Sequence, residues 1–389
     1  MNTALRKILI TLIVLLILAL IGLLVYYFVI KKPVPEEEEP GRLPPAEEKG
    51  GLPPEEEGLV PQPEIKIKAI SKEAVLSPTL TSDKAGVIYY TRSNGNVWQS
   101  NFDGSDLTQV SSAVLENLVK VLWSPDKKRA FTIFKDNLEN VTKYFYTHET
   151  DKALPLNKYI EDIAWSPDGN KIAYQYQNEF LNENYISVAN PDGSGFSNVS
   201  TTKMRDLIIE WPKGAEIFFR EKPSGLVRSS LFSINSSTKA IIKIISDIYG
   251  LSIKWSPEGD KIFYSKTGPD GKNIAIFFAS RDGSNQKTAH VSTLAEKCVC
   301  SQDPRMIFCA IPRNIEQANV LPDDFYKGTF IADDEFYKIN IENGDRVKIL
   351  DDSQMTEPYD AVDLFLSPQE DYLFFVNKTN GLLYSIKLD

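Results

Sequence analysis

The feature of the sequence that most constrains its fold is a turn motif that returns along the chain at nearly constant spacing. Its clearest copy is Trp165-Ser166-Pro167-Asp168-Gly169. The order Ser-Pro-Asp-Gly supplies a hydrogen-bond acceptor, a fixed φ and a glycine at the positions where a tight turn needs them. Apolar runs lie on both sides of the turn, as in a β-hairpin. The chain after residue 64 is therefore predicted to consist of repeated hairpins.

Seven copies of this motif are recognisable, and several of them are degenerate. The copies at residues 123–126 and 255–259 keep the tryptophan, serine and proline, whereas the copy at residues 211–214 lacks the serine. Successive anchors lie 42 to 47 residues apart, with one spacing of 66, at Leu76, Trp123, Trp165, Trp211, Trp255, Cys300 and Leu366. Strand-rich units that repeat about every 40–50 residues are typical of β-propeller blades.

A second turn signal falls once in most repeats. It is Asp-Gly-Ser at residues 103–105, 192–194 and 282–284, and an asparagine-containing turn at 235–237 and 343–345. Two turns per repeat, one inside each of two hairpins, indicate four strands per blade. The predicted fold class is all-β, a seven-bladed β-propeller of four-stranded blades over residues 64–389.

The two turn motifs together resemble the TolB-type β-propeller repeat, a WD-repeat-like unit in which a Trp-Ser-Pro-Asp-Gly turn is followed by an Asp-Gly-Ser turn before the outermost strand. The resemblance covers roughly residues 64 to 389. It implies the propeller fold and names no ligand. TolB-type propellers typically have six blades and a separate small domain, whereas seven repeats and no such domain are found here.

The two ends of the repeat region are predicted to pair with each other. The last repeat offers only three strands, at residues 361–366, 372–376 and 382–388. Residues 64–71, which contain Ile65, Ile67 and Ile70, would add the missing outer strand. Such pairing closes the ring and removes an exposed strand edge.

Residues 8–30 contain no charged side chain over 23 positions. As a helix they would be about 34 Å long, enough to span a bilayer. A cleaved signal peptide is the alternative, but the apolar run exceeds the ~7–15 residues expected and no small-x-small site ends it. A retained single-pass transmembrane anchor is therefore predicted. Because Arg6 and Lys7 lie in the short leading tail, the N-terminus is expected in the cytoplasm and the propeller outside it.

Residues 31–63 hold nine prolines and nine glutamates and are predicted to be a disordered, extended linker. At the rise of polyproline II it would reach at most about 100 Å. The chain has a net charge of −10. An acidic propeller offers no basic face to displace counterions from phosphates, so nucleic acid is not expected as a partner.

The long spacing before the last anchor locates an insertion at residues 312–334. Long loops on a rigid scaffold often carry binding residues. Carboxylates beside aromatic rings would suit a cationic or carbohydrate group. The alternative is a loop folded over the end of the channel, with buried aromatics and acids that cap turns. The candidate partner-binding residues are Asp323, Asp324, Phe325, Tyr326, Asp333, Asp334, Phe336 and Tyr337.

All three cysteines lie in the sixth repeat. When Cys300 is aligned with Trp255, the strand register places Cys298 opposite Cys309, within reach of a disulfide. An exported domain permits such a bond. The alternative is three reduced cysteines in the core.

No catalytic, cofactor or metal site is predicted. The two histidines, His148 and His290, lie in different repeats, and the sequence has no Gly-x-Ser-x-Gly elbow or zinc-type spacing. Asp103, Asp192 and Asp282 belong to Asp-Gly turns that need no calcium ion.

The sequence favours a non-catalytic binding or scaffold module of the cell envelope, in the periplasm or at the cell surface, with envelope proteins or glycans as partners. One alternative is an envelope hydrolase or lyase acting on polysaccharide or peptide, with two carboxylates about 5–10 Å apart at the channel mouth. Another is a subunit of a larger membrane complex.

Overall fold

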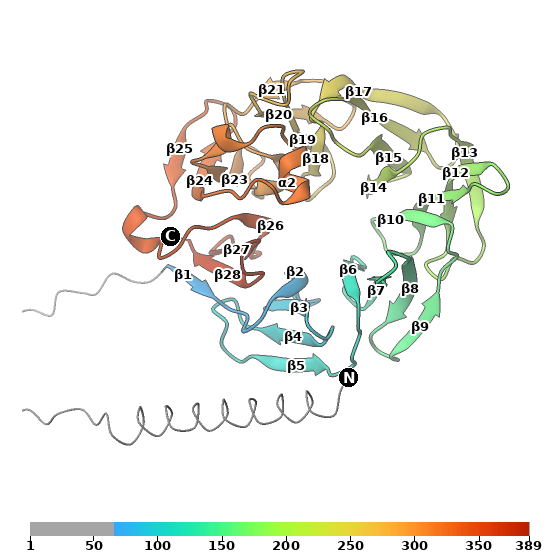
Figure 1. Cartoon of the computed structure of the whole chain (residues 1–389), viewed down its shortest axis with the longest axis horizontal. Helices are drawn as coiled ribbons and strands as arrows, with labels where there is room; N and C mark the ends of the chain where they lie inside the picture. The colour runs from blue at the N-terminus through green and yellow to red at the C-terminus, as the bar shows by residue number, and fades with distance from the viewer. Residues whose placement is uncertain (1–65, 389) are drawn as a thin grey trace, which may run out of the picture. The chain divides into compact units, whose positions relative to one another are not determined.

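A computed structural model describes residues 66–388. The chain divides into two units, residues 1–62 and 63–389, and the described residues all belong to the second. They form seven antiparallel sheets of four strands each, arranged around a common axis (Figure 1). The prediction of a seven-bladed propeller with four-stranded blades is confirmed. The candidate anchor and linker, residues 8–30 and 31–63, lie outside the described residues.

The strands of each blade are numbered in chain order, starting from the axis. Blade one is β2 (Val75–Leu80), β3 (Val87–Thr91), β4 (Val97–Ser100) and β5 (Thr108–Ser111). Blade two is β6 (Leu118–Trp123), β7 (Arg129–Lys135), β8 (Val141–Thr147) and β9 (Lys152–Pro155). Blade three is β10 (Ile160–Trp165), β11 (Ile172–Asn178), β12 (Glu183–Ala189) and β13 (Ser197–Thr201). Blade four is β14 (Leu207–Lys213), β15 (Glu216–Glu221), β16 (Arg228–Asn235) and β17 (Ile241–Tyr249).

The last three blades follow the same order. Blade five is β18 (Ser252–Trp255), β19 (Lys261–Lys266), β20 (Ala275–Ser280) and β21 (Lys287–Thr288). Blade six is β22 (Cys298–Cys300), β23 (Met306–Pro312), β24 (Asp334–Asn340) and β25 (Arg346–Lys348). Blade seven is β26 (Ala361–Leu366), β27 (Tyr372–Asn377), β28 (Leu383–Lys387) and β1 (Ile67–Ala69).

Blade seven takes its outer strand from the other end of the domain. β1 runs antiparallel to β28, with Ile67 opposite Ile386 and Ala69 opposite Tyr384. In Figure 1 the blue β1 lies beside the red β28. The strand that the sequence places at residues 64–71 is thus found at its centre, and the pairing joins the first and last strands of the propeller.

The repeated motif folds into the turn that its residue types specify. In blade three the hydroxyl of Ser166 donates to Asp168 Oδ1 at 2.6 Å and accepts from the backbone N–H of Lys171 at 2.9 Å. Gly169 has φ +69°, a left-handed conformation that strains residues bearing a Cβ. Each such turn joins the first and second strands of a blade, where the hairpins were expected.

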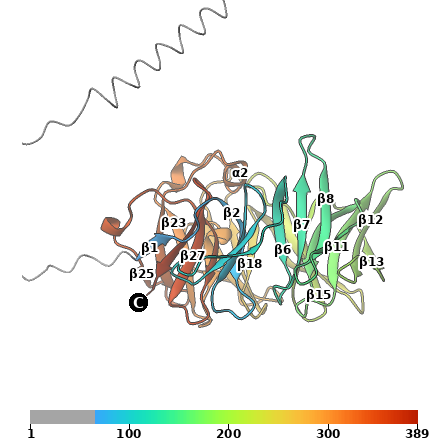
Figure 2. The ribbon, with the colours of Figure 1, turned by 90° about the horizontal axis from the view of Figure 1, so that it is seen from below.

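The propeller has two different faces. The links between first and second strands and between third and fourth strands lie on one face, here called the turn face. The links between second and third strands and between blades lie on the opposite face, here called the link face. In the side view the hairpins β7–β8 and β11–β12 and the short helix α2 (Asp323–Lys327) rise on the link face (Figure 2).

The core lies between blades rather than inside them. Phe131 of blade two packs against Ile172 and Tyr174 of blade three, and other blade pairs are joined in the same way. Second strands supply much of this core, and β3 is buried along its whole length. The exposed outer strand β9 shows the opposite pattern. This position explains why the apolar, aromatic-rich segments follow the tight turns in the sequence.

The tryptophans of the turn motif join neighbouring blades through both rings and hydrogen bonds. The indole N–H of Trp123 donates to the carbonyl of Ser77 at 2.8 Å, and that of Trp165 donates to the carbonyl of Leu122 at 3.0 Å. The ring of Trp165 also stacks on Phe131. These contacts fit the packing role expected for a buried aromatic ring with a polar N–H.

Among the residues that the structure describes, no helix combines the length and apolar character needed to cross a membrane.

Candidate functional site

The insertion of blade six folds into an ordered cover on the link face. It contains the 3-10 turn η3 (Ile315–Gln317) and the helix α2, and its apolar side chains form a small core of their own with neighbouring blades. Phe325 and Phe330 are buried in that core. The backbone of Leu321 donates to the carbonyl of Gly271 in blade five at 2.9 Å. The insertion therefore forms part of the folded domain.

Two of the candidate acids bind backbone groups. Asp323 accepts from the hydroxyl of Ser224 at 3.0 Å and from the backbone N–H of Gly225 at 2.7 Å, which ties α2 to blade four. Asp324 accepts from the backbone N–H of Val320 at 3.0 Å. This backbone donor is the first cause of the lowered pKa of Asp324.

The other candidates are also held by internal contacts. Asp333 forms an ion pair with Arg313 at 2.9 Å. Phe336 is fully buried between blades six and seven. The hydroxyl of Tyr337 donates to Glu335 at 2.8 Å. The predicted site residues thus lie in one region of the structure, but most of them stabilise it.

Tyr326 is the candidate with the largest exposed area, at 48%. Its hydroxyl donates to the carboxylate of Glu296 and lies 2.7 Å from the hydroxyl of Ser252. Glu296 belongs to the 3-10 turn η2 (Ala295–Lys297) that precedes blade six. Burial of the hydroxyl raises the pKa of Tyr326, and the charge of Glu296 adds to that shift. The phenol therefore stays protonated and fastens the insertion to blade five.

Asp334 belongs to a fully buried ionic cluster that joins blades six and seven. The ammonium of Lys297 lies 2.6 Å from Asp334 Oδ2 and 2.7 Å from Asp360 Oδ1, and it also donates to the carbonyl of Ala361 at 3.1 Å. All three charged side chains are at most 1% exposed. Burial raises the pKa of Asp334 to about 6, although Lys297 opposes that shift.

The cysteines pair as the strand register predicts. Cys298 on β22 lies directly opposite Cys309 on β23, and the two form a disulfide with a Cα–Cα distance of 4.1 Å. Cys300 is the free cysteine among the described residues. Its sulfur lies 3.9 Å from the carbonyl of Trp255, and burial raises the pKa of its thiol to about 12.

This arrangement predicts one reactive thiol in denatured protein isolated without reductant, and three after reduction. Mass spectrometry of alkylated protein would identify Cys300 as the single labelled residue. Cys309→Ser is the control, because it should expose Cys298 and raise the unreduced count to two. Three labelled residues in unreduced wild-type protein would contradict the bond.

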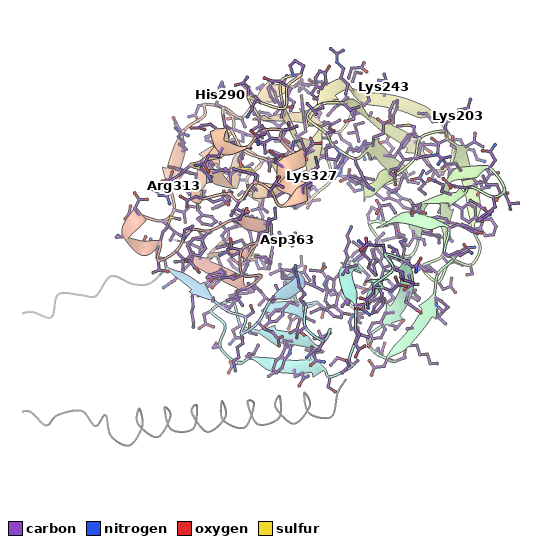
Figure 3. The ribbon with its side chains drawn as sticks, in the orientation of Figure 1. Lys203, Lys243, His290, Arg313, Lys327 and Asp363 are labelled. Carbon is purple, nitrogen blue, oxygen red and sulfur yellow. A yellow bond between two sulfur atoms is a disulfide. The ribbon has the colours of Figure 1, made fainter. Side chains whose placement is uncertain are left out.

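A cavity of about 380 Å³ opens at the turn-face end of the axis. It is here called the channel cavity. First strands of five blades line it, because these strands are the ones nearest the axis (Figure 1). Trp123 and Trp165 supply part of its wall, and Lys127, Lys254 and Asp363 supply its charges. Figure 3 shows Asp363 on the side of blade seven that faces the central axis.

The electrostatics of the channel cavity are mixed. Burial lowers the pKa of Lys127, and the neighbouring cation of Lys84 acts in the same direction. Lys254 also acts on Glu210 of blade four, whose pKa is raised by burial and lowered less by Arg220 and Lys254. Glu210 Oε2 lies 3.6 Å from Arg220 Nε, and neither atom has a hydrogen-bond partner within the described part of the chain. Polar groups with spare hydrogen-bonding capacity thus lie near the cavity.

Sequence reasoning did not find Lys127, Lys254 or Asp363. A local signal exists, because Lys254 immediately precedes the anchor Trp255 in a first strand whose alternate residues face the axis and the neighbouring blade. The insertion drew attention because of its length. The channel cavity instead gathers single residues from separate repeats, and only the closed ring brings them together.

No family model and no curated protein sequence match this chain. Solved structures with a similar fold include an oligogalacturonate lyase in complex with manganese, at 12% identity and a TM-score of 0.58, covering 83% of this chain and 93% of the lyase. The oligogalacturonate lyase of Vibrio parahaemolyticus is similar at 12% identity and TM-score 0.58, covering 82% and 93% of the two chains. TolB of Acinetobacter baumannii is also a neighbour, at 12% identity and TM-score 0.45, covering 72% and 63%. The chain is thus a seven-bladed β-propeller with TolB-like proteins among its structural neighbours.

Proposed function

We propose that this protein is a membrane-tethered β-propeller of the cell envelope that acts outside the cytoplasm as a non-catalytic binding module for an envelope protein or glycan. The channel cavity carries this proposal, because it combines aromatic walls with a few charged groups on a rigid ring. Concave sites of this composition are the usual places for ligands in a scaffold of fixed shape. The uncharged segment of residues 8–30 and the acidic linker support the tether.

The lining of the channel cavity indicates the kind of group that it binds. The ammonium groups of Lys127 and Lys254 suit a carboxylate, whereas Asp363 suits a hydroxyl or an amine. The indole rings of Trp123 and Trp165 offer flat apolar surface beside these charges. An acidic sugar or an acidic side chain of an envelope protein satisfies all three features. The insertion remains a second predicted contact surface, through the exposed edge of Tyr326.

A second candidate function is a lyase or hydrolase acting in the same cavity, and Lys127 is the observation that favours it. A lysine with a lowered pKa can act as a general base, which the elimination reaction of a polysaccharide lyase requires. The lyases with a similar fold show the fold alone. The two functions differ in a measurable way, because a binding module leaves its ligand unchanged.

Crosslinking in native membranes tests the binding role. A photo-reactive amino acid in place of Lys254 is expected to capture an envelope component, whereas the same amino acid in place of Lys243 on the outer strand β17 should not (Figure 3). Protease added outside intact cells should degrade the propeller. Equal capture at both positions would contradict the cavity, and a fully protected propeller would contradict the orientation.

Turnover is tested on the same material. Purified full-length protein incubated with a uronic-acid polysaccharide should give no unsaturated product by ultraviolet absorbance if it is a binding module. Product formation that Lys127→Met abolishes would establish the lyase instead.

A further inference from the structure

A second kind of cavity lies away from the axis, on the side of blade three that faces blade two. Its volume is about 330 Å³, and it is here called the blade-three cleft. Tyr174, Tyr176 and Tyr185 form its floor. Tyr176 lies directly opposite Tyr185 in the β11–β12 register, with ring centroids 6.4 Å apart. Alternate residues of a strand share one face, so the three rings point into the same cleft.

Acidic side chains stand at both ends of this aromatic floor. Glu183 begins β12 and Asp192 follows its end, so they are separated by about 20 Å at the rise of a β-strand. Asp192 accepts hydrogen bonds from the hydroxyl and the backbone N–H of Ser194, which lower its pKa and keep it ionised. No lysine or arginine is present among the described residues that line the cleft. Its charge is therefore negative and uncompensated by its own lining.

Blade two carries a cleft of the same chemistry. This blade-two cleft has a volume of about 440 Å³ and is lined by Phe134, Tyr144 and Tyr146. The rings of Phe134 and Tyr144 meet edge to face at 5.6 Å. Its acidic residues are Glu116 and Asp136, and again no basic residue is found among its described lining residues.

The match between the two clefts follows from the repeat. Phe134 and Tyr176 occupy equivalent positions in the second strands of neighbouring blades, on the side turned toward the preceding blade. Asp136, like Asp192, is held ionised by a turn, because it accepts from Asn140 and from the backbone N–H of Leu138, and these bonds lower its pKa. Aromatic faces beside carboxylates thus recur on adjacent blades, so an elongated ligand would meet the same chemistry twice.

We propose that the blade-two and blade-three clefts bind alkylammonium or guanidinium groups, and that an extended basic ligand occupies both. Aromatic rings attract cations over their faces, and nearby carboxylates add a charge partner that water does not fully screen. The apolar stems of lysine and arginine suit a floor of tyrosine and phenylalanine. The occupant is either a lysine-rich or arginine-rich segment of another protein or a free polyamine. This site is separate from the channel cavity and does not depend on the function proposed for it.

The test measures binding of two probes to detergent-solubilised full-length protein. A fluorescent peptide with lysine at every second position is followed by anisotropy, and spermidine is followed by calorimetry. Both Tyr185→Leu and the double variant Glu116→Gln/Glu183→Gln are expected to weaken binding about tenfold, a loss typical of one cation–π or charge contact. Raising the salt concentration should weaken binding to wild-type protein.

Two controls make the outcome decisive. Glu149→Gln removes an exposed carboxylate outside both clefts and should leave affinity unchanged, and a peptide with glutamine in place of lysine should not bind. Tight binding of the peptide alone would identify a protein segment as the ligand, and equal binding of spermidine would identify a polyamine. The proposal is overturned if neither probe binds, if the glutamine peptide binds equally, or if Glu149→Gln has the effect of the cleft variants. Circular dichroism verifies that each variant is folded.

Discussion

Replacing Lys297 with methionine is expected to lower the free energy of unfolding by about 3–5 kcal/mol, the loss typical when one partner of a buried ion pair is removed. Lys297 is enclosed with Asp334 and Asp360, and no side chain of the three is more than 1% exposed. Without the ammonium, two carboxylates face each other away from water. Chemical denaturation of wild-type and variant protein measures the difference.

Two further variants separate the effect of charge from that of packing. Lys338→Met makes the same substitution at an exposed position of blade six and is expected to cost less than about 1 kcal/mol. The triple variant Lys297→Met/Asp334→Asn/Asp360→Asn should recover much of the loss, because no buried charge remains. If Lys297→Met were as stable as Lys338→Met, the buried cluster would not contribute to stability.

The same cluster predicts a pH dependence. Burial raises the pKa of Asp334 to about 6 in the folded state, whereas an unfolded aspartate titrates near 3.9. The folded state therefore binds a proton that the unfolded chain has released. The stability contributed by this proton is fully present below about pH 4 and is lost as the pH rises to about 6 and above. Asp334→Asn should lower the melting temperature less than wild type over this range, and parallel curves would contradict the assignment.

Deleting residues 64–71 is expected to lower the melting temperature by about 5–10 °C. The deletion removes β1 from blade seven and exposes the edge of β28. It also removes Ile67 and Ile70, each 5% exposed, from two core clusters. Losing a buried isoleucine side chain typically costs about 2–5 kcal/mol, and a domain of this size converts each kcal/mol into about 1–3 °C.

Point variants test the closure without shortening the chain. Ile70→Ala should reproduce part of the shift, whereas Lys68→Ala, an exposed residue of the same strand, should leave the melt nearly unchanged. Calorimetry of the full-length protein gives all three values. An unchanged melt for the deletion would show that the strand is not needed to hold the ring closed.

Much of the fold could be predicted from the sequence because its signals are local. A serine, proline, aspartate and glycine in order define a turn within a few residues, as Ser166 and Gly169 show. The facing of Cys298 and Cys309 follows from a hairpin register that can be counted from the turn. The insertion was also located by counting. Its internal contacts could not be counted, because Asp323 binds Ser224 in a blade two repeats earlier.

The sequence by itself determined the number of blades, the strands in each blade and the strand that closes the ring, because these depend on turn chemistry and on alternation along single strands. Only the tertiary structure decided which side chains meet. Lys297 reaches Asp360 across 63 residues, and the channel cavity joins Trp123 with Lys254 and Asp363. The physical reason is ring closure, which brings the first strands of separate repeats to one axis, and no pattern within a repeat encodes what its distant neighbours place there.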